Sequence, residues 1–129
     1  MNRRMIFILL TVLLMWGLCA CEMQQVDGNA AGTIAYAYGG VTFEETLSAA
    51  EVAEVAAILD GKILFADHPA CIFYDAITFT IDGETFALAC DGCGLVKNCE
   101  TGLYMTLSDA QRDALVAMFA SRGASFPSA

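Results

Sequence analysis

The segment 89–94, Ala-Cys-Asp-Gly-Cys-Gly, contains two cysteines, Cys90 and Cys93, whose spacing supports three different chemistries. A Cys-x-x-Cys pair can hold zinc, perform thiol–disulfide exchange, or supply halves of structural disulfide bonds. Cys71 and Cys99 could complete a zinc site or pair with these cysteines in disulfide bonds. The compartment in which the chain folds decides among them, because thiols stay reduced in the cytosol and disulfides form outside it.

The first residues are typical of an export signal. Arg3 and Arg4 supply positive charge, and an apolar run follows from Met5 to Leu18. This run of about 14–16 residues is shorter than the ~20 residues that a membrane-spanning helix needs. The pattern therefore predicts a signal peptide over residues 1–20 and disfavours a membrane anchor that stays in the chain.

The end of the apolar run, Leu18-Cys19-Ala20-Cys21, resembles the lipobox of bacterial membrane lipoproteins. Leu18, Ala20 and Cys21 occupy its first, third and last positions, and Cys19 is a small but unusual occupant of the second. The resemblance implies that Cys21 receives a diacylglyceryl group through a thioether and becomes the first residue of the mature protein. Two or three acyl chains, at about 0.8 kcal/mol per buried methylene, make a lasting anchor. The protein would then be held at the cell membrane or outer membrane, with its domain on the extracytoplasmic side.

The remaining chain is predicted to hold a lipidated Cys21 with a flexible tether over residues 21–32, and one domain over residues 33–126. The tether is predicted from its low apolar content and its turn-forming residues, and about ten residues reach at most ~35 Å. The full chain has a net charge of −9, and removal of the signal makes it more acidic. Such a chain is a poor partner for nucleic acid. A protein partner is possible, and the sequence does not identify it.

Two amphipathic helices are predicted, at 48–61 and 108–123. Each begins at a serine that is followed three residues later by Glu51 or Gln111, which is the capping-box pattern. Each ends at a glycine. Apolar residues at helical spacing in both segments indicate one buried face.

The segment from Phe73 to Cys90 predicts a β-hairpin. Asp82 and Gly83 form a two-residue turn signal between two β-prone stretches. The turn pairs Ile81 with Glu84 and therefore Phe79 with Phe86. This register places a set of apolar side chains on one face of the hairpin: Ile77, Phe79, Phe86, Leu88 and Cys90.

Further strands are predicted on both sides of this hairpin, at 33–47 with a turn at its paired glycines, at 62–66, and in two pieces within 94–107. Consecutive strands joined by hairpins indicate an antiparallel sheet. The expected fold class is α+β: a sheet of about four to six strands covered on one face by two amphipathic helices.

An even number of cysteines in a small exported domain favours structural disulfide bonds among Cys71, Cys90, Cys93 and Cys99. The extended hairpin register brings Cys71 near both members of the Cys-x-x-Cys pair. The favoured pairing is Cys71 with Cys93 and Cys90 with Cys99, although bulges at the neighbouring glycines could reverse it.

Zinc bound by Cys71, Cys90, Cys93 and Cys99 is the alternative cofactor, and its ligand spacing is loose for a zinc site. Thiol–disulfide chemistry at the Cys-x-x-Cys pair is a further alternative, weakened because no helix begins after Cys93. Apart from the lipid on Cys21, no cofactor is expected.

The sequence favours a role without catalysis. His68, the only histidine, lies in an Asp-His-Pro turn and has no Gly-x-Ser-x-Gly segment to accompany it. Asp91 is expected to cap a turn beside Gly92. The segment 89–94, Tyr104 and the Leu-Ser-x-x-Gln start of the last helix resemble small bacterial lipoproteins without an assigned activity, over about the last 60 residues. The expected function is a binding or envelope-associated role of a disulfide-bonded acidic lipoprotein; the alternative is a thiol-redox or zinc-handling lipoprotein that uses Cys90 and Cys93.

Overall fold

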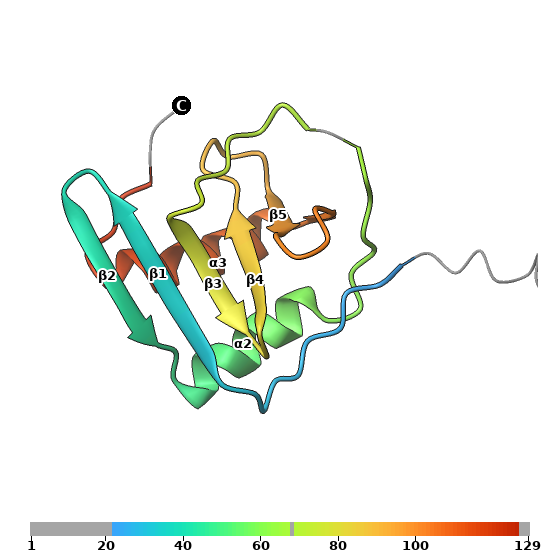
Figure 1. The fold of residues 1–129 in the computed structure, drawn as a ribbon, viewed down its shortest axis with the longest axis horizontal. Coiled ribbons are helices and arrows are strands. Elements are labelled where there is room, and N and C mark those ends of the chain that lie inside the picture. Colours follow the sequence, from blue (N-terminus) through green and yellow to red (C-terminus); the bar gives the residue numbers. More distant parts are fainter. Residues whose placement is uncertain (1–21, 68, 127–129) are drawn as a thin grey trace, which may run out of the picture.

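The computed structural model describes residues 22–67 and 69–126 (Figure 1). The predicted signal peptide, the predicted lipidation site Cys21 and the turn residue His68 lie outside the described residues. The described chain forms a mixed α+β fold, as predicted. Its elements in chain order are β1 (Gly32–Tyr38), β2 (Val41–Thr46), α2 (Ala49–Leu59), β3 (Ile77–Ile81), β4 (Glu84–Leu88), β5 (Leu95–Asn98), β6 (Tyr104–Thr106) and α3 (Asp109–Ala120).

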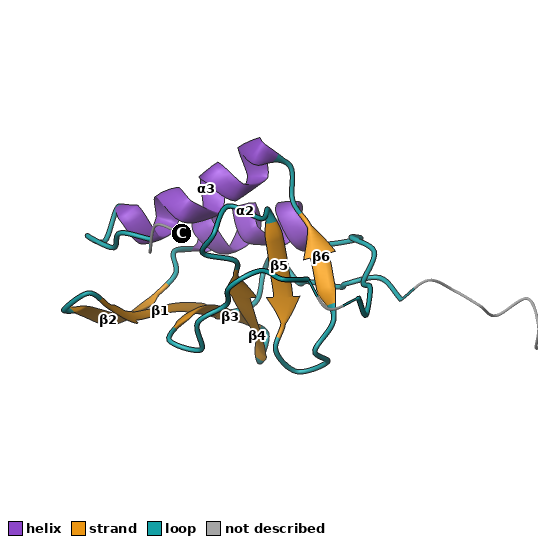
Figure 2. Cartoon of the chain, turned by 90° about the horizontal axis from the view of Figure 1, so that it is seen from above, coloured by secondary structure: helices purple, strands orange, loops and turns teal. Residues whose placement is uncertain are grey.

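The strands form one six-stranded open sheet in the order β2-β1-β3-β4-β5-β6, and every neighbouring pair is antiparallel. The helix α2 lies in the connection between β2 and β3, and β3 then pairs with β1 instead of β2. Figure 2 shows α2 and α3 together on one side of β1–β4, with β5 and β6 standing at an angle to the other strands.

The central hairpin has the predicted register. Asp82 and Gly83 both have positive φ angles, 52° and 77°, as a type I′ turn requires. Ile81 pairs with Glu84 and Phe79 with Phe86. The apolar face predicted from this register is buried: Ile77, Phe79, Phe86, Leu88 and Cys90 are each at most 3% exposed.

Both helices begin at the predicted capping boxes. In α2 the backbone N–H of Glu51 donates to the Ser48 hydroxyl, and the Glu51 carboxylate accepts from the backbone N–H of Ser48. In α3 Ser108 and Gln111 make the same reciprocal pair. These bonds satisfy backbone donors that the first turn of a helix leaves without partners.

The helices and the sheet share one apolar core. Phe119 of α3 lies against Tyr36 of β1, with ring centroids 6.4 Å apart. At Gly32, where β1 begins, a Cβ would come within 2.9 Å of the Val52 side chain of α2. This close approach explains the glycine at that position, because any larger residue would push α2 away from the sheet.

Residues 22–31, where the sequence predicts a flexible tether, are bonded to the rest of the described chain. This segment lies antiparallel to the chain that follows α2. The backbone N–H of Gln24 donates to the backbone carbonyl of Lys62 at 2.8 Å, and the backbone N–H of Leu64 donates to the backbone carbonyl of Glu22 at 2.9 Å. The side chain of Gln24 is only 3% exposed. The segment looked like a linker because its partners are distant in sequence and leave no local pattern. It is the first part of the folded domain.

The strand predicted at 62–66 is present only as two isolated bridges, Ile63 with Met23 and Phe65 with Tyr104. The second bridge contains a pair of hydrogen bonds between Phe65 and Tyr104, at 3.0 and 2.9 Å. Phe65 therefore pairs with the edge of β6 that does not face β5.

Candidate functional site

Cys71 and Cys93 form a disulfide bond, with an S–S distance of 2.10 Å and a Cα–Cα distance of 6.1 Å. The Cα separation is within the usual range for a disulfide. This bond is the first of the two predicted pairings, and the structure confirms it. It joins the segment before β3 to the loop between β4 and β5.

A turn before β3 brings these two cysteines together. The backbone N–H of Ile77 donates to Tyr74, and the backbone N–H of Cys90 donates to Ile72 at 2.9 Å. The hairpin register alone would have placed Cys90 level with Asp75. The turn therefore shifts the pairing by three residues and sets Ile72 beside Cys90.

Asp91 links the two chain segments that the Cys71–Cys93 disulfide joins; we call these residues, 71–72 and 91–93, the disulfide corner. One carboxylate oxygen accepts from the backbone N–H of Cys93 at 3.3 Å, which is the predicted turn-capping role. The other oxygen accepts from the backbone N–H of Ile72 at 3.0 Å. Asp91 therefore bonds to Cys93 itself and to Ile72, the residue after Cys71.

The second predicted pairing, Cys90 with Cys99, is wrong, and both thiols are free. The backbone N–H of Cys99 donates to Thr85 at 2.8 Å, so Cys99 lies level with Thr85 across the β4–β5 pair. Cys90 is five residues further along, on the order of 16 Å at about 3.3 Å per residue. Residues five apart on a strand also point to opposite faces. A disulfide needs Cα atoms within about 7 Å, so this pair cannot bond.

The two free thiols have different surroundings. Cys90 is 3% exposed within the core, and burial raises its thiol pKa to about 11. Cys99 is exposed as a residue, while partial burial of its sulfur raises its thiol pKa. A raised pKa lowers the fraction of thiolate, which is the reactive form. Neither environment is that of an activated cysteine.

A zinc site formed by all four cysteines is not assembled by this geometry. Zinc ligands lie about 2.3 Å from the metal, whereas Cys99 is separated from Cys90 by most of the length of β4. The structure instead groups the sulfurs of Cys71 and Cys93 with a carboxylate oxygen of Asp91, all within 4.8 Å of one another. The disulfide occupies both sulfurs, so this group could ligate a metal only after reduction.

A buried polar cluster joins the N-terminal segment to β4 and β5, and the sequence did not reveal it. The side-chain amide of Asn98 donates to the side-chain oxygen Oε1 of Gln24 at 2.8 Å. The Gln24 amide donates to the Glu84 carboxylate at 2.9 Å. Asn98 is 1% exposed. An asparagine on the core side of a strand is the one feature of the sequence that could have signalled this cluster.

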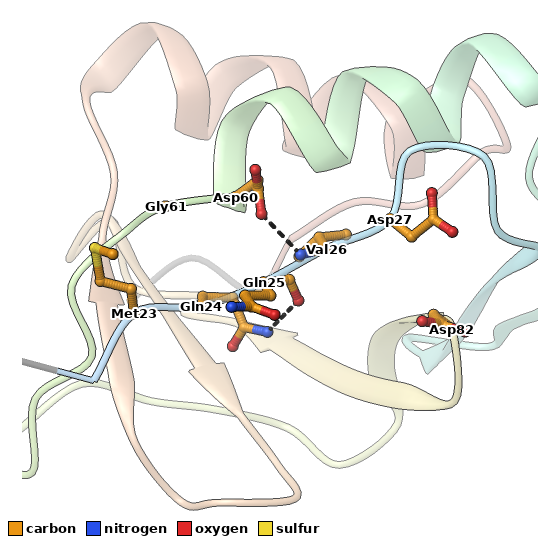
Figure 3. A pocket seen from close by; sticks show the side chains of 8 residues that line it. All are labelled: Met23, Gln24, Gln25, Val26, Asp27, Asp60, Gly61 and Asp82. Carbon is orange, nitrogen blue, oxygen red and sulfur yellow. Dashed lines mark hydrogen bonds between the residues drawn. The ribbon is translucent and has the colours of Figure 1, made fainter.

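Beside this cluster the N-terminal segment borders an open pocket of about 510 Å³ (Figure 3). The backbone N–H of Val26 donates to the Asp60 carboxylate at 3.0 Å, and both residues line the pocket. The lining residues are Met23, Gln24, Gln25, Val26, Asp27, Asp60, Gly61 and Asp82. The lining carries three carboxylates and no basic side chain, so it does not suit an anionic ligand.

Met23, near the start of the N-terminal segment, and Ile63, after α2, form one of the two isolated bridges. They are 58% and 59% exposed and belong to the few large apolar side chains that the described chain leaves in solvent. Neither residue was singled out from the sequence.

The fold and the disulfide corner define a small α+β domain with one observed disulfide bond. Comparison with protein-family models, with curated proteins and with solved structures found no match. Within residues 22–67 and 69–126, neither helix is both long enough and apolar enough to cross a bilayer.

Proposed function

We propose that the protein is a bacterial membrane lipoprotein, anchored through a diacylglyceryl group on Cys21. Its acidic α+β domain, with two helices covering one face of the sheet, would act on the extracytoplasmic side of the cell membrane or outer membrane. The proposed role is binding or envelope-associated and not catalytic. The observation that carries the proposal is the lipobox pattern of residues 18–21 at the end of the apolar run.

The disulfide bond between Cys71 and Cys93 supports this location. Disulfide bonds form and persist in oxidising environments outside the cytosol. The surroundings of the free thiols support a role without thiol catalysis, because Cys90 is buried and burial raises its pKa to about 11.

The anchor is tested by the Cys21→Ser variant in cells supplied with labelled palmitate. Loss of label and of membrane retention is the expected result, because a serine cannot form the thioether. Cys19→Ser is the matched control, since Cys19 is not the lipidated position and a small residue is retained there. Unchanged labelling of Cys21→Ser would refute the proposal.

A second candidate function is metal handling by the reduced disulfide corner, and the grouping of Cys71, Cys93 and Asp91 within 4.8 Å favours it. Reduction would supply two thiolates, which are good ligands for zinc, and Asp91 would supply an oxygen. Titration of the reduced protein with zinc against a chromogenic chelator tests it. Stoichiometric binding that Cys93→Ser removes and Cys99→Ser preserves is expected; equal binding by both variants would refute it.

A further inference from the structure

The chain between the predicted lipid anchor and the folded domain has almost no free length. Cys21 precedes Met23 by two residues, so their Cα atoms are at most about 7 Å apart. From Glu22 onward the chain is held by hydrogen bonds, the first of which runs from the backbone N–H of Leu64 to the backbone carbonyl of Glu22 at 2.9 Å. A flexible tether of about ten residues would have allowed up to ~35 Å.

Two exposed apolar side chains, Met23 and Ile63, lie close to the predicted anchor. Met23 and Ile63 lie next to each other through their bridge and are both more than half exposed, at 58% and 59%. The chain beside Met23 cannot swing away from the domain, because Gln24 is 3% exposed and bonded to Asn98 at 2.8 Å. Acyl chains on Cys21 would therefore hold these two side chains at the surface of the bilayer.

We propose that Met23 and Ile63 insert into the interfacial region of the bilayer, so that the domain rests directly on the membrane in a fixed orientation. This inference rests on the proposed function, because it needs lipid on Cys21. Apolar side chains at such a surface reach about 5–10 Å into the boundary between headgroups and acyl chains.

The charges next to this apolar pair suit a zwitterionic surface. In the sequence, Glu22 precedes Met23 and Lys62 precedes Ile63, and these two residues carry opposite charges. The carboxylates that line the neighbouring pocket would repel an anionic surface. The lipid surface expected is therefore one of neutral headgroups.

Tryptophan fluorescence can test the orientation, because the only tryptophan of the chain, Trp16, lies in the predicted signal peptide. Met23→Trp and Ile63→Trp place a single reporter at each proposed contact. Tyr38→Trp is the matched control: Tyr38 is also exposed, at 40%, and lies at the β1–β2 turn. All three are made in the full chain and purified in the lipidated form.

The lipidated variants are bound to phosphatidylcholine vesicles whose acyl chains carry bromine, which quenches nearby tryptophan. We expect severalfold stronger quenching for Met23→Trp and Ile63→Trp than for Tyr38→Trp. Vesicle-bound protein with no quenching at residues 23 and 63, or with equal quenching at residue 38, would overturn the orientation and leave the lipoprotein proposal intact. Protein without lipid on Cys21 would overturn the proposed function and this inference with it.

Discussion

The side chain of Asn98 in β5 donates to the side chain of Gln24, 74 residues earlier in the chain, at 2.8 Å. Both residues are nearly fully buried, at 1% and 3% exposure. Glu84 completes the cluster by accepting from both amides, at 2.9 and 3.4 Å. Buried polar groups of this kind are stable only while every partner is present. The cluster therefore fastens the N-terminal segment to β4 and β5.

Replacing Gln24 by alanine is expected to destabilise the domain by about 1–3 kcal/mol, because the buried amide of Asn98 would lose its closest acceptor. The free energy of unfolding in urea measures the effect. Gln25→Ala is the matched control, since Gln25 is the exposed neighbour in the same segment. Equal stabilities for the two variants would contradict a structural role of the cluster.

The features that the sequence predicted correctly are those with local causes. The turn at Asp82-Gly83 sets the hairpin register because two consecutive positive φ angles favour this pair of residue types. The capping boxes at Ser48 and Ser108 involve residues three apart, so they can be read without knowing the tertiary structure.

The features that the sequence did not predict depend on distant contacts or on turns without a signal. The turn that shifts Ile72 to Cys90 contains Tyr74, Asp75 and Ala76, with neither glycine nor proline. Extrapolating the hairpin across this turn gave the right partner for Cys71 but not the right register. The docking of Gln24 depends on Asn98, and no local pattern in residues 22–31 reports it.

Removing the disulfide bond by Cys71→Ser is expected to destabilise the domain by about 3 kcal/mol. The cysteines are separated by 22 residues, so the bond restricts a sizeable loop in the unfolded chain. Thermal or urea unfolding under oxidising conditions measures the loss. Cys99→Ser, at an exposed position without a bond, should stay within about 0.5 kcal/mol of the unaltered protein. A comparable loss in both variants would contradict the assigned pairing.

The two free thiols are expected to react at different rates with an alkylating reagent in the folded protein. Cys90 is buried, and the resulting rise of its pKa to about 11 leaves little thiolate at mildly alkaline pH. Cys99 is exposed and should be modified first, although its own pKa is also raised. Peptide mapping by mass spectrometry after brief alkylation identifies the labelled site. Modification of Cys90 should require denaturant, and equal labelling of both thiols would contradict its burial.

Arg122, just after α3, links three elements through its guanidinium group. It bonds to Glu51 of α2 at 2.9 Å and to Glu45 of β2 at 2.8 Å. The bond from Arg122 is the largest cause that holds the pKa of Glu51 at about 2, below its ordinary value of 4.5. Because the folded-state pKa is the lower one, the stabilisation is complete above the unfolded value of 4.5. It is lost as the pH falls from there through about 2.

The variant Glu51→Gln tests this linkage, because glutamine preserves the capping box at the start of α2 and removes only the charge. We expect the variant to be less stable than the unaltered protein by roughly 1 kcal/mol near neutral pH, since the pair is partly exposed to solvent. The difference should shrink as the pH falls below about 4.5, because protonation of Glu51 removes the same charge in the unaltered protein. Urea unfolding across this pH range measures it. Glu54→Gln, which removes an exposed carboxylate from the same helix, is the matched control. A stability difference for Glu51→Gln that does not change with pH would mean that its charge does not couple to Arg122.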